Sequence, residues 1–470
     1  MTPRFRLFGL LSIACLTYLP SQGADQGHER LDSEFQAALA EYNSGHFGEA
    51  SGQLEKLVRR LPESFEVHEL LGMVYSAESE DVKAGEHLEK AVRLNPTSAA
   101  AHANLATNLV RLKKFAPAEV EFKKAVELEP QSYDAVHNLG EFYIASGKLP
   151  QALPYLEKAQ RIRPAAYDNG YDLSLAYVES ARYDQARQSI ESLLGKKDTA
   201  ELHNLLAEVD EKDGKFVDAE NQYEIAAHMD PSEGNLFDWG SELLLHRTLD
   251  PSIEVFRRAV ERYPSSPRLA IGLGMALYSR GNYDEAVKAL LKATELSPSD
   301  PRCYYFLSKA YNSSPSQAKE VIQSFHRFRE LKPQDARAAY YYALSLWKGG
   351  RTQDAGVDIG QIESLLKDSI QHDANFADAY LQLGNLYSEQ NKYADAIPEY
   401  ERALELNPEL ADGHYRLGQA YVHSGQKQLA QQQLAIYQRL RAAHLADLER
   451  QRAEIQQFVY SEKEGPNSKP

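Results

Sequence analysis

Three arginines have the spacing most suggestive of a recognition site: Arg268, Arg302 and Arg337 recur at intervals of 34 and 35 residues. In "DPRCYYFLSKAY", residues 300–311, Asp300 is the predicted N-cap of a helix that begins just before Arg302. The positive end of the helix dipole disfavours a cation there by roughly 0.3–1 kcal/mol. Tyrosines follow, and arginine with aromatic rings is the composition of binding hot spots. The pattern therefore indicates binding chemistry.

Catalytic and metal-binding motifs are absent from the sequence. None of its fourteen histidines stands in an HExxH motif, and there is no phosphate loop or paired-cysteine motif. A carboxylate pair of the glycosidase type would have to lie inside a groove. Four histidines share position 4 of the repeats described below, which is predicted to pack helix against helix: His68, His102, His203 and His414. We predict no catalytic site, no metal and no cofactor.

The composition is that of a folded protein with an acidic surface. The chain has 470 residues, of which 43% are hydrophobic and 26% charged, and its net charge is −16. Nucleic-acid binding needs clustered positive charge, so no nucleic-acid partner is expected.

The N-terminus has the layout of a secretory signal peptide. Two arginines precede an apolar run over residues 7–19, and small residues follow, with cleavage predicted after Gly23 or Ala24. The run has 13 residues, too short for a membrane span. A lipid anchor at Cys15 is the alternative. We therefore expect residues 1–23 to be removed and the protein to be secreted or periplasmic.

Removal of the signal peptide leaves Cys303 as the one remaining cysteine. That excludes an intrachain disulfide and a cysteine-rich zinc site.

Prolines recur with a period of about 34 residues through most of the chain. Aligning the sequence on them gives twelve repeats, which begin near Leu31 and end near Arg441. The prolines that define the period are Pro62, Pro96, Pro130, Pro164, Pro231, Pro264, Pro298, Pro333 and Pro408. The period predicts one helix–turn–helix in each repeat.

Two positions of the repeat are restricted to small residues, which let two helices cross closely. Position 20 is almost always alanine, and glycine in "SGHF", "SGKL", "DGKF" and "RGNY" is predicted to end the first helix. Position 8 holds Ala38, Gly72, Ala106, Gly140, Ser174, Ala207, Gly240, Gly274, Ser308, Ala343, Gly384 and Gly418.

The pattern resembles the tetratricopeptide repeat. The clearest copy is "AYLQLGNLYSEQNKYADAIPEYERALELNP", whose matching residues are Leu383, Gly384, Tyr387, Tyr393, Ala396, Tyr400, Ala403 and Pro408. The resemblance implies an all-α, right-handed superhelical solenoid. Two repeats depart from it: the fifth has Asp198 in place of its proline, and the tenth has Ala374 there and extra residues within 352–374.

The predicted domain organisation follows from the repeats. Residues 31–441 form the solenoid, whose repeats are stable only when stacked. Residues 442–459 continue the helical pattern with a polar face, as expected of a capping helix. Residues 460–470 are expected to be disordered.

The resemblance also implies that positions 2, 5, 6, 9, 12 and 13 of each first helix line a concave binding surface. Seven of the twelve residues at position 2 are acidic, whereas the eighth to tenth repeats carry the three arginines. The first six repeats are rich in acids at these positions, and the later repeats combine cations with aromatic rings. The predicted binding residues are Arg268, Arg302, Arg337, Tyr305, Lys309, Tyr340, Trp347, Phe237, Tyr278, Asn104 and Asn138.

These patterns predict a non-catalytic scaffold that binds an extended peptide or a partner protein in the groove. Its ligand is expected to be acidic at the arginines, and its acidic half is expected to contact something basic. The competing interpretation of the arginines is local pairing with acids, worth about 0–1 kcal/mol each. An assembly factor that bridges envelope components through its outer surface, or an enzyme, are the alternative functions. Lysine never occurs at position 5, so the carboxylate clamp found in some members of the family is not expected.

Overall fold

The structure is a computed structural model that describes residues 26–352, 358–442, 453–457 and 459. Every described element is a helix, and the chain divides into two compact units, with the boundary between Ala219 and Glu220. The predicted signal peptide, residues 1–23, and the predicted tail, residues 460–470, lie outside this part of the chain. Among the described residues, no helix is both long and apolar enough to cross a bilayer.

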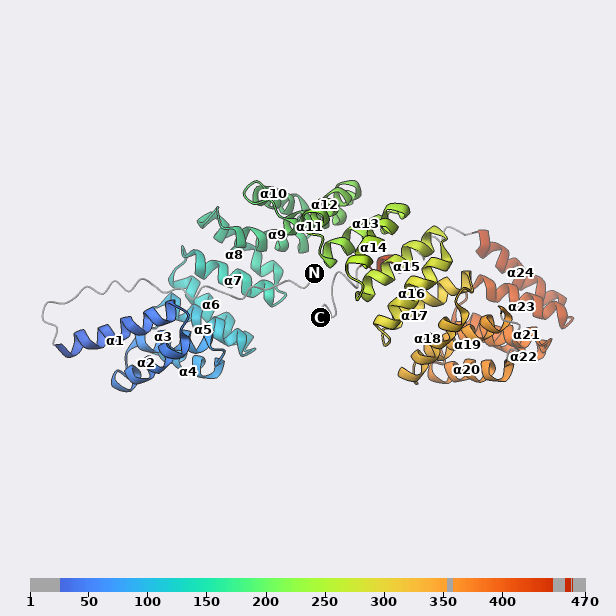
Figure 1. Ribbon diagram of the computed structural model, residues 1–470, viewed down its shortest axis with the longest axis horizontal. Coiled ribbons are helices and arrows are strands. Elements are labelled where there is room, and N and C mark those ends of the chain that lie inside the picture. The colour runs from blue at the N-terminus through green and yellow to red at the C-terminus, as the bar shows by residue number, and fades with distance from the viewer. Residues whose placement is uncertain (1–25, 353–357, 443–452, 458, 460–470) are drawn as a thin grey trace. The chain divides into compact units, whose positions relative to one another are not determined.

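The N-terminal unit is built from helices up to the first residues of α12 (Figure 1). Their bounds are α1 Gln26–Asn43, α2 Phe47–Arg60, α3 Phe65–Ala77, α4 Asp81–Leu94, α5 Ala99–Arg111, α6 Phe115–Leu128, α7 Tyr133–Ala145, α8 Leu149–Ile162, α9 Tyr167–Glu179, α10 Tyr183–Leu194, α11 Ala200–Lys212 and α12 Phe216–Met229.

The C-terminal unit continues the same arrangement from Glu220 onward. Its helices are α13 Glu233–Leu245, α14 Leu249–Arg262, α15 Pro267–Arg280, α16 Tyr283–Leu296, α17 Pro301–Ser313, α18 Ala318–Leu331, α19 Ala336–Thr352, α20 Ile359–His372, α21 Ala377–Glu389, α22 Tyr393–Leu406, α23 Ala411–His423 and α24 Lys427–Ala442. Residues 453–457 are also helical.

Helices pack as consecutive pairs, and each pair stacks on the next. The first helix of a pair contacts its own partner, for example α15 with α16, and also the first helix of the next pair, for example α15 with α17. Successive odd-numbered helices therefore form a layer, from α1 to α9 in the N-terminal unit and from α13 to α19 in the C-terminal unit. We call the side of this layer that carries positions 2, 5, 6, 9, 12 and 13 the inner surface.

Serine, threonine or aspartate caps many first helices, as the sequence predicts for α17. Asp300 accepts a hydrogen bond from the Arg302 amide at 2.9 Å, and Ser266 caps α15 by accepting from the Leu269 amide at 3.3 Å. Such caps satisfy amide donors that no helical carbonyl can reach. They fix where each repeat begins.

The small residue at position 8 sets the distance between paired helices. A Cβ placed on Gly274 would lie 2.4 Å from Cγ of Leu290, sixteen residues later on α16. The same conflict recurs between Gly72 and Leu88, with 2.6 Å to Cγ. Where position 20 is serine, Ser252 donates to the Gly240 carbonyl at 2.8 Å. The expectation that small residues permit close crossing is thus confirmed.

The turn within most pairs has a left-handed residue at position 15. Gly147 and Gly281 have φ of +68° and +94° there, and Ala181 adopts φ of +54° at the same position. Glycine adopts this conformation without steric cost, which is why the sequence so often places it in this turn.

Histidine or tyrosine at position 4 links a repeat to the one before it. Three histidines place Nε2 at 2.9–3.1 Å from the carbonyl oxygen of the preceding closing proline: His68–Pro62, His102–Pro96 and His414–Pro408. Because a carbonyl only accepts, each Nε2 donates. Tyr304 does the same with the Pro298 carbonyl at 2.9 Å. These histidines therefore serve packing, and the described residues include no cluster able to hold a metal.

The close crossing at position 8 yields a stability prediction. Gly274→Ala is expected to lower the free energy of unfolding by roughly 1–3 kcal/mol, because the new methyl group must displace Leu290 or separate α15 from α16. Urea unfolding followed by circular dichroism measures the change.

Gly234→Ala is the matched control, because no atom lies within 4 Å of the added Cβ. Alanine there removes glycine's helix penalty, so stability should be unchanged or rise by at most about 1 kcal/mol. Equal effects of the two substitutions would contradict the packing account.

Candidate functional site

The arginines of the C-terminal unit that were predicted to bind a ligand all contact acids. Arg302 binds Asp300 through both Nε, at 3.0 Å, and a terminal nitrogen, at 2.7 Å. Arg337 lies 3.6 Å from Asp335 in the same relative position. The capping carboxylate thus neutralises the cation that the helix dipole disfavours. This arrangement explains why arginine is tolerated at the start of α17 and α19.

Arg268 is held by the preceding repeat. Its Nε donates to Glu233 at 2.7 Å, and its guanidinium lies 5.0 Å from the centroid of the Phe237 ring. Burial raises the pKa of Glu233, but hydrogen bonds from Ser266 and Arg268 outweigh it and lower the pKa overall. The three arginines can therefore be explained as structural pairs, and their binding role stays a prediction.

Several of the other predicted residues lie in the core. Phe237 is fully buried and packs edge-on against Phe256. Trp347 is buried and its Nε1 donates to Glu389 on α21 at 3.2 Å. In the N-terminal unit Asn104 is also buried. Such side chains can shape the inner surface, but they present little area to a partner.

The remaining predicted residues lie at the surface. Asn138 is partly exposed on α7. Tyr278, Tyr305 and Tyr340 are partly buried and pack against the core of the C-terminal unit from α15, α17 and α19. Their rings leave an aromatic surface, and Lys309 lies against the Tyr305 ring within it.

Of these side chains, Lys309 contacts the residue that is farthest away in the sequence. Its Nζ lies 2.5 Å from Oε2 of Glu454, 145 residues later, and 4.9 Å from the centroid of the Tyr305 ring. Burial and a hydrogen bond with Glu454 raise the pKa of Tyr305. The negative charge of Glu454 also helps to raise the pKa values of Tyr278 and Tyr341. One carboxylate therefore contacts Lys309 and Tyr305 on α17, and its charge also influences tyrosines on the neighbouring helices α15 and α19.

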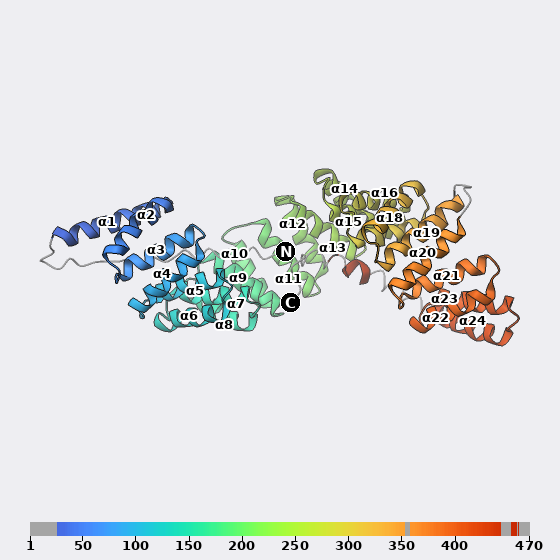
Figure 2. The same ribbon diagram turned by 90° about the horizontal axis from the view of Figure 1, so that it is seen from below.

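The segment that carries Glu454 is docked on the inner surface of the C-terminal unit. Val459 is fully buried in the core formed by α13 to α19, and Ile455 packs against that core. Figures 1 and 2 both show residues 453–457, in dark red, beside the yellow-green helices and apart from α24. We refer to residues 453–457 and 459 as the docked segment.

This placement differs from the expected cap on the last repeat. The sequence predicts a capping helix over residues 442–459, of which residues 443–452 lie outside the described part of the chain. The docked segment instead contacts α17, because the aromatic surface offers both a cation for Glu454 and apolar contacts for Ile455 and Val459. A helical, amphipathic pattern predicts that a partner surface exists without indicating which surface it is.

The inner surface of the N-terminal unit has the opposite charge. Three acids, Glu69, Glu141 and Asp172, lie on α3, α7 and α9. Burial is the largest cause that raises their pKa values, and repulsion by neighbouring acids adds to it. The pKa values become about 7 for Glu69, about 8 for Glu141 and about 7 for Asp172. A hydrogen bond with the buried Asn104 side chain lowers the pKa of Glu69 and so offsets part of the increase. A cationic ligand would be favoured here because it would relieve the repulsion.

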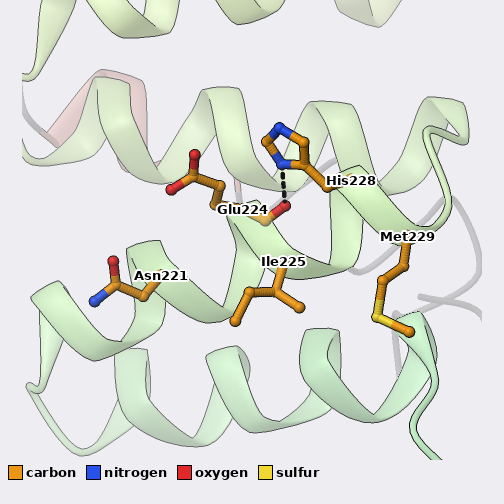
Figure 3. A pocket seen from close by; sticks show the side chains of 5 residues that line it. All are labelled: Asn221, Glu224, Ile225, His228 and Met229. Carbon is orange, nitrogen blue, oxygen red and sulfur yellow. Dashed lines mark hydrogen bonds between the residues drawn. The ribbon is translucent and has the colours of Figure 1, made fainter.

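A shallow hollow of about 570 Å³ lies along α12 (Figure 3). Its lining side chains are Asn221, Glu224, Ile225, His228 and Met229. The His228 Nδ1 donates to the Glu224 carbonyl at 2.9 Å, which is a contact within the helix. None of the residues predicted for binding lines this hollow.

The raised acid pKa values predict a pH-dependent stability of the N-terminal unit. Glu141 ionises near pH 4.5 when unfolded and near pH 8 when folded, so the folded state binds more protons between these values and loses stability as pH rises. Glu141→Gln should therefore raise the melting temperature by about 2–6 °C at pH 8 and change it little near pH 5.

Glu191→Gln, which changes an exposed carboxylate on α10, is the control and should have a small effect at both pH values. Differential scanning calorimetry at the two pH values tests this. A Glu141→Gln effect that is equal at pH 5 and pH 8 would show that the carboxylate ionises normally.

Comparison with known proteins identifies the repeat. A model described as TPR repeat matches residues 384–425, and models described as tetratricopeptide repeat match residues 35–99, 121–153, 143–209, 237–301 and 310–362. These matches cover most of the chain and agree with the observed helix pairs.

Curated relatives match over parts of the chain. Protein O-mannosyl-transferase TMTC3 of Mus musculus is 26% identical over 190 residues, which are 38% of this chain and 20% of that protein. The peroxisomal targeting signal receptor of Saccharomyces cerevisiae is 27% identical over 133 residues, 28% of this chain and 20% of the receptor. The chain thus spans about a fifth of the length of these relatives.

Among solved structures, a chain described as the functional characterization of Pseudomonas aeruginosa pilF is 22% identical. The superposition covers 44% of this chain and 94% of that chain, with a TM-score of 0.39. The repeat pattern, the helix pairs and the matched family models agree, and the prediction of an all-α solenoid is confirmed. The protein belongs to the tetratricopeptide repeat family.

Proposed function

We propose that the protein is a non-catalytic interaction scaffold that binds an acidic segment of a partner protein on the inner surface of α15, α17 and α19. The repeat architecture supports protein partners in general, and one matched relative is named a receptor. The observation that carries the finer proposal is the contact between Glu454 and Lys309 at 2.5 Å. A carboxylate on a peptide segment is already held at this surface.

The chemistry of the surface suits such a ligand. Lys309 supplies the charge and Tyr305 supplies a hydroxyl and a ring, while Tyr278 and Tyr340 add partly buried rings on the neighbouring helices α15 and α19. Buried or half-buried ion pairs backed by aromatic contacts give specificity and slow dissociation. The three arginines of the same helices would add long-range attraction for an acidic partner, at a cost in their local pairs.

Catalysis is the competing class, because matched relatives include proteins named O-mannosyl-transferases. The TMTC3 match covers 20% of the mouse protein, and tetratricopeptide repeat models match most of this chain. The proposal therefore assigns this chain the interaction role.

Secretion is a separate part of the proposal and rests on the signal-peptide pattern of residues 1–23. N-terminal sequencing of protein recovered from its native host should find Ala24 or Asp25 as the first residue. Recovery of the intact N-terminus from a cytosolic fraction would refute it.

Selection from a library of random peptides tests the binding site. The purified full chain should enrich peptides that carry glutamate or aspartate, and Lys309→Glu should reduce their affinity by at least about tenfold and enrich basic peptides instead. Reversal of the selected charge would tie recognition to this one side chain.

Arg337→Glu is the matched control on the neighbouring helix, because Arg337 is exposed and paired with Asp335. It should change affinity less than Lys309→Glu. If all three chains select the same peptides, the binding surface lies elsewhere, and if none selects any, the scaffold proposal for this unit fails.

A further inference from the structure

The docked segment contacts the inner surface through one side of a short helix. Ile455 and Val459 are four residues apart and therefore share a face, while Ala453 and Gln457 are exposed. Glu454 lies beside this face, with its side chain 21% exposed. The described residues of the segment thus present one carboxylate and two β-branched aliphatic side chains to the surface.

The contacts of the segment coincide with the proposed binding residues. Glu454 meets Lys309 and Tyr305, and its charge reaches Tyr278 and Tyr341. These four residues occupy inner-surface positions 9, 5, 12 and 6 of their repeats. A partner segment bound to these residues would have to displace the docked segment, because two carboxylates cannot occupy the same place.

We infer that residues 453–459 act as an intramolecular competitor for the partner site and that they display the partner's chemistry. The partner class is an amphipathic helical segment with a carboxylate followed directly by a β-branched aliphatic residue and by a second aliphatic residue one turn later. This inference rests on the proposed function, since it concerns the occupant of the same surface.

The small size of the docked interface makes exchange feasible. Its described residues contribute one buried valine, one partly buried isoleucine and one ion pair, and Lys309 keeps 31% of its side chain exposed. Attachment to the same chain supplies a high effective concentration without strong contacts. Only molecules in which the segment has left the surface can bind an external ligand. The apparent affinity is therefore the intrinsic affinity multiplied by the fraction of such molecules.

Binding of a fluorescent synthetic peptide with the sequence of residues 450–461 tests the inference. The receptor is the full chain, either wild type or with Val459→Asp, which places a charge where the structure buries an aliphatic side chain. The peptide should bind the Val459→Asp chain at least about tenfold more tightly than the wild type, because the internal competitor is gone.

Two further variants isolate the cause. Gln457→Asp alters an exposed residue of the same segment and should leave peptide affinity at the wild-type value. Val459→Asp combined with Lys309→Glu should lose the gain, and a peptide with Glu454→Lys should then bind this double variant, because the two charges of the pair have been exchanged. Circular dichroism and thermal unfolding must match across the variants.

Each outcome separates the inference from the proposed function. Equal, measurable binding to wild type and Val459→Asp would mean that the surface binds such helices without internal competition, which overturns the inference and leaves the proposed function intact. Failure of the peptide to bind either chain would overturn the inferred partner chemistry. The charge reversal in the random-peptide selection would still decide the proposed function.

Discussion

The close approach of two helices within each repeat is the constraint on which the rest of the structure depends. At position 8 the first helix has no room for a longer side chain, because a large residue sixteen positions later, such as Leu290 or Phe256, lies against it. Position 20 is small for the same reason, and Ser252 there even donates to the carbonyl of Gly240. This crossing fixes which face of each first helix meets its partner, and the opposite face becomes the inner surface.

Contacts between repeats turn separate pairs into continuous layers. The side chain at position 4, histidine or tyrosine, reaches back to the carbonyl that ends the preceding repeat. Because such polar contacts and most of the apolar core use other positions, the inner-surface residues can differ from repeat to repeat. The chain uses that freedom to place acids on α3, α7 and α9 of one unit, and cations with tyrosines on α15, α17 and α19 of the other.

Charge alone does not mark a binding residue on such a surface. The arginines are conspicuous in the sequence, yet each lies against an acid at the start of its own helix or of the first helix in the preceding repeat. Lys309 is less conspicuous in the sequence, but its partner comes from the distant docked segment. The distinction is physical: a cap carboxylate next to an arginine balances the helix dipole locally, whereas Lys309, in the middle of its helix, pairs with an acid brought to it by long-range packing.

The sequence by itself determined the helix pairs, their boundaries and the small residues at positions 8 and 20, because these follow from local caps, turns and a periodic pattern repeated many times. It also indicated which positions face inward. Only the tertiary structure decided that Phe237 and Trp347 are buried, since burial depends on the neighbouring repeats. It alone placed Glu454 and Val459 on α17 and its neighbours, because an amphipathic helix encodes the need for a partner face and leaves the choice of face to long-range packing.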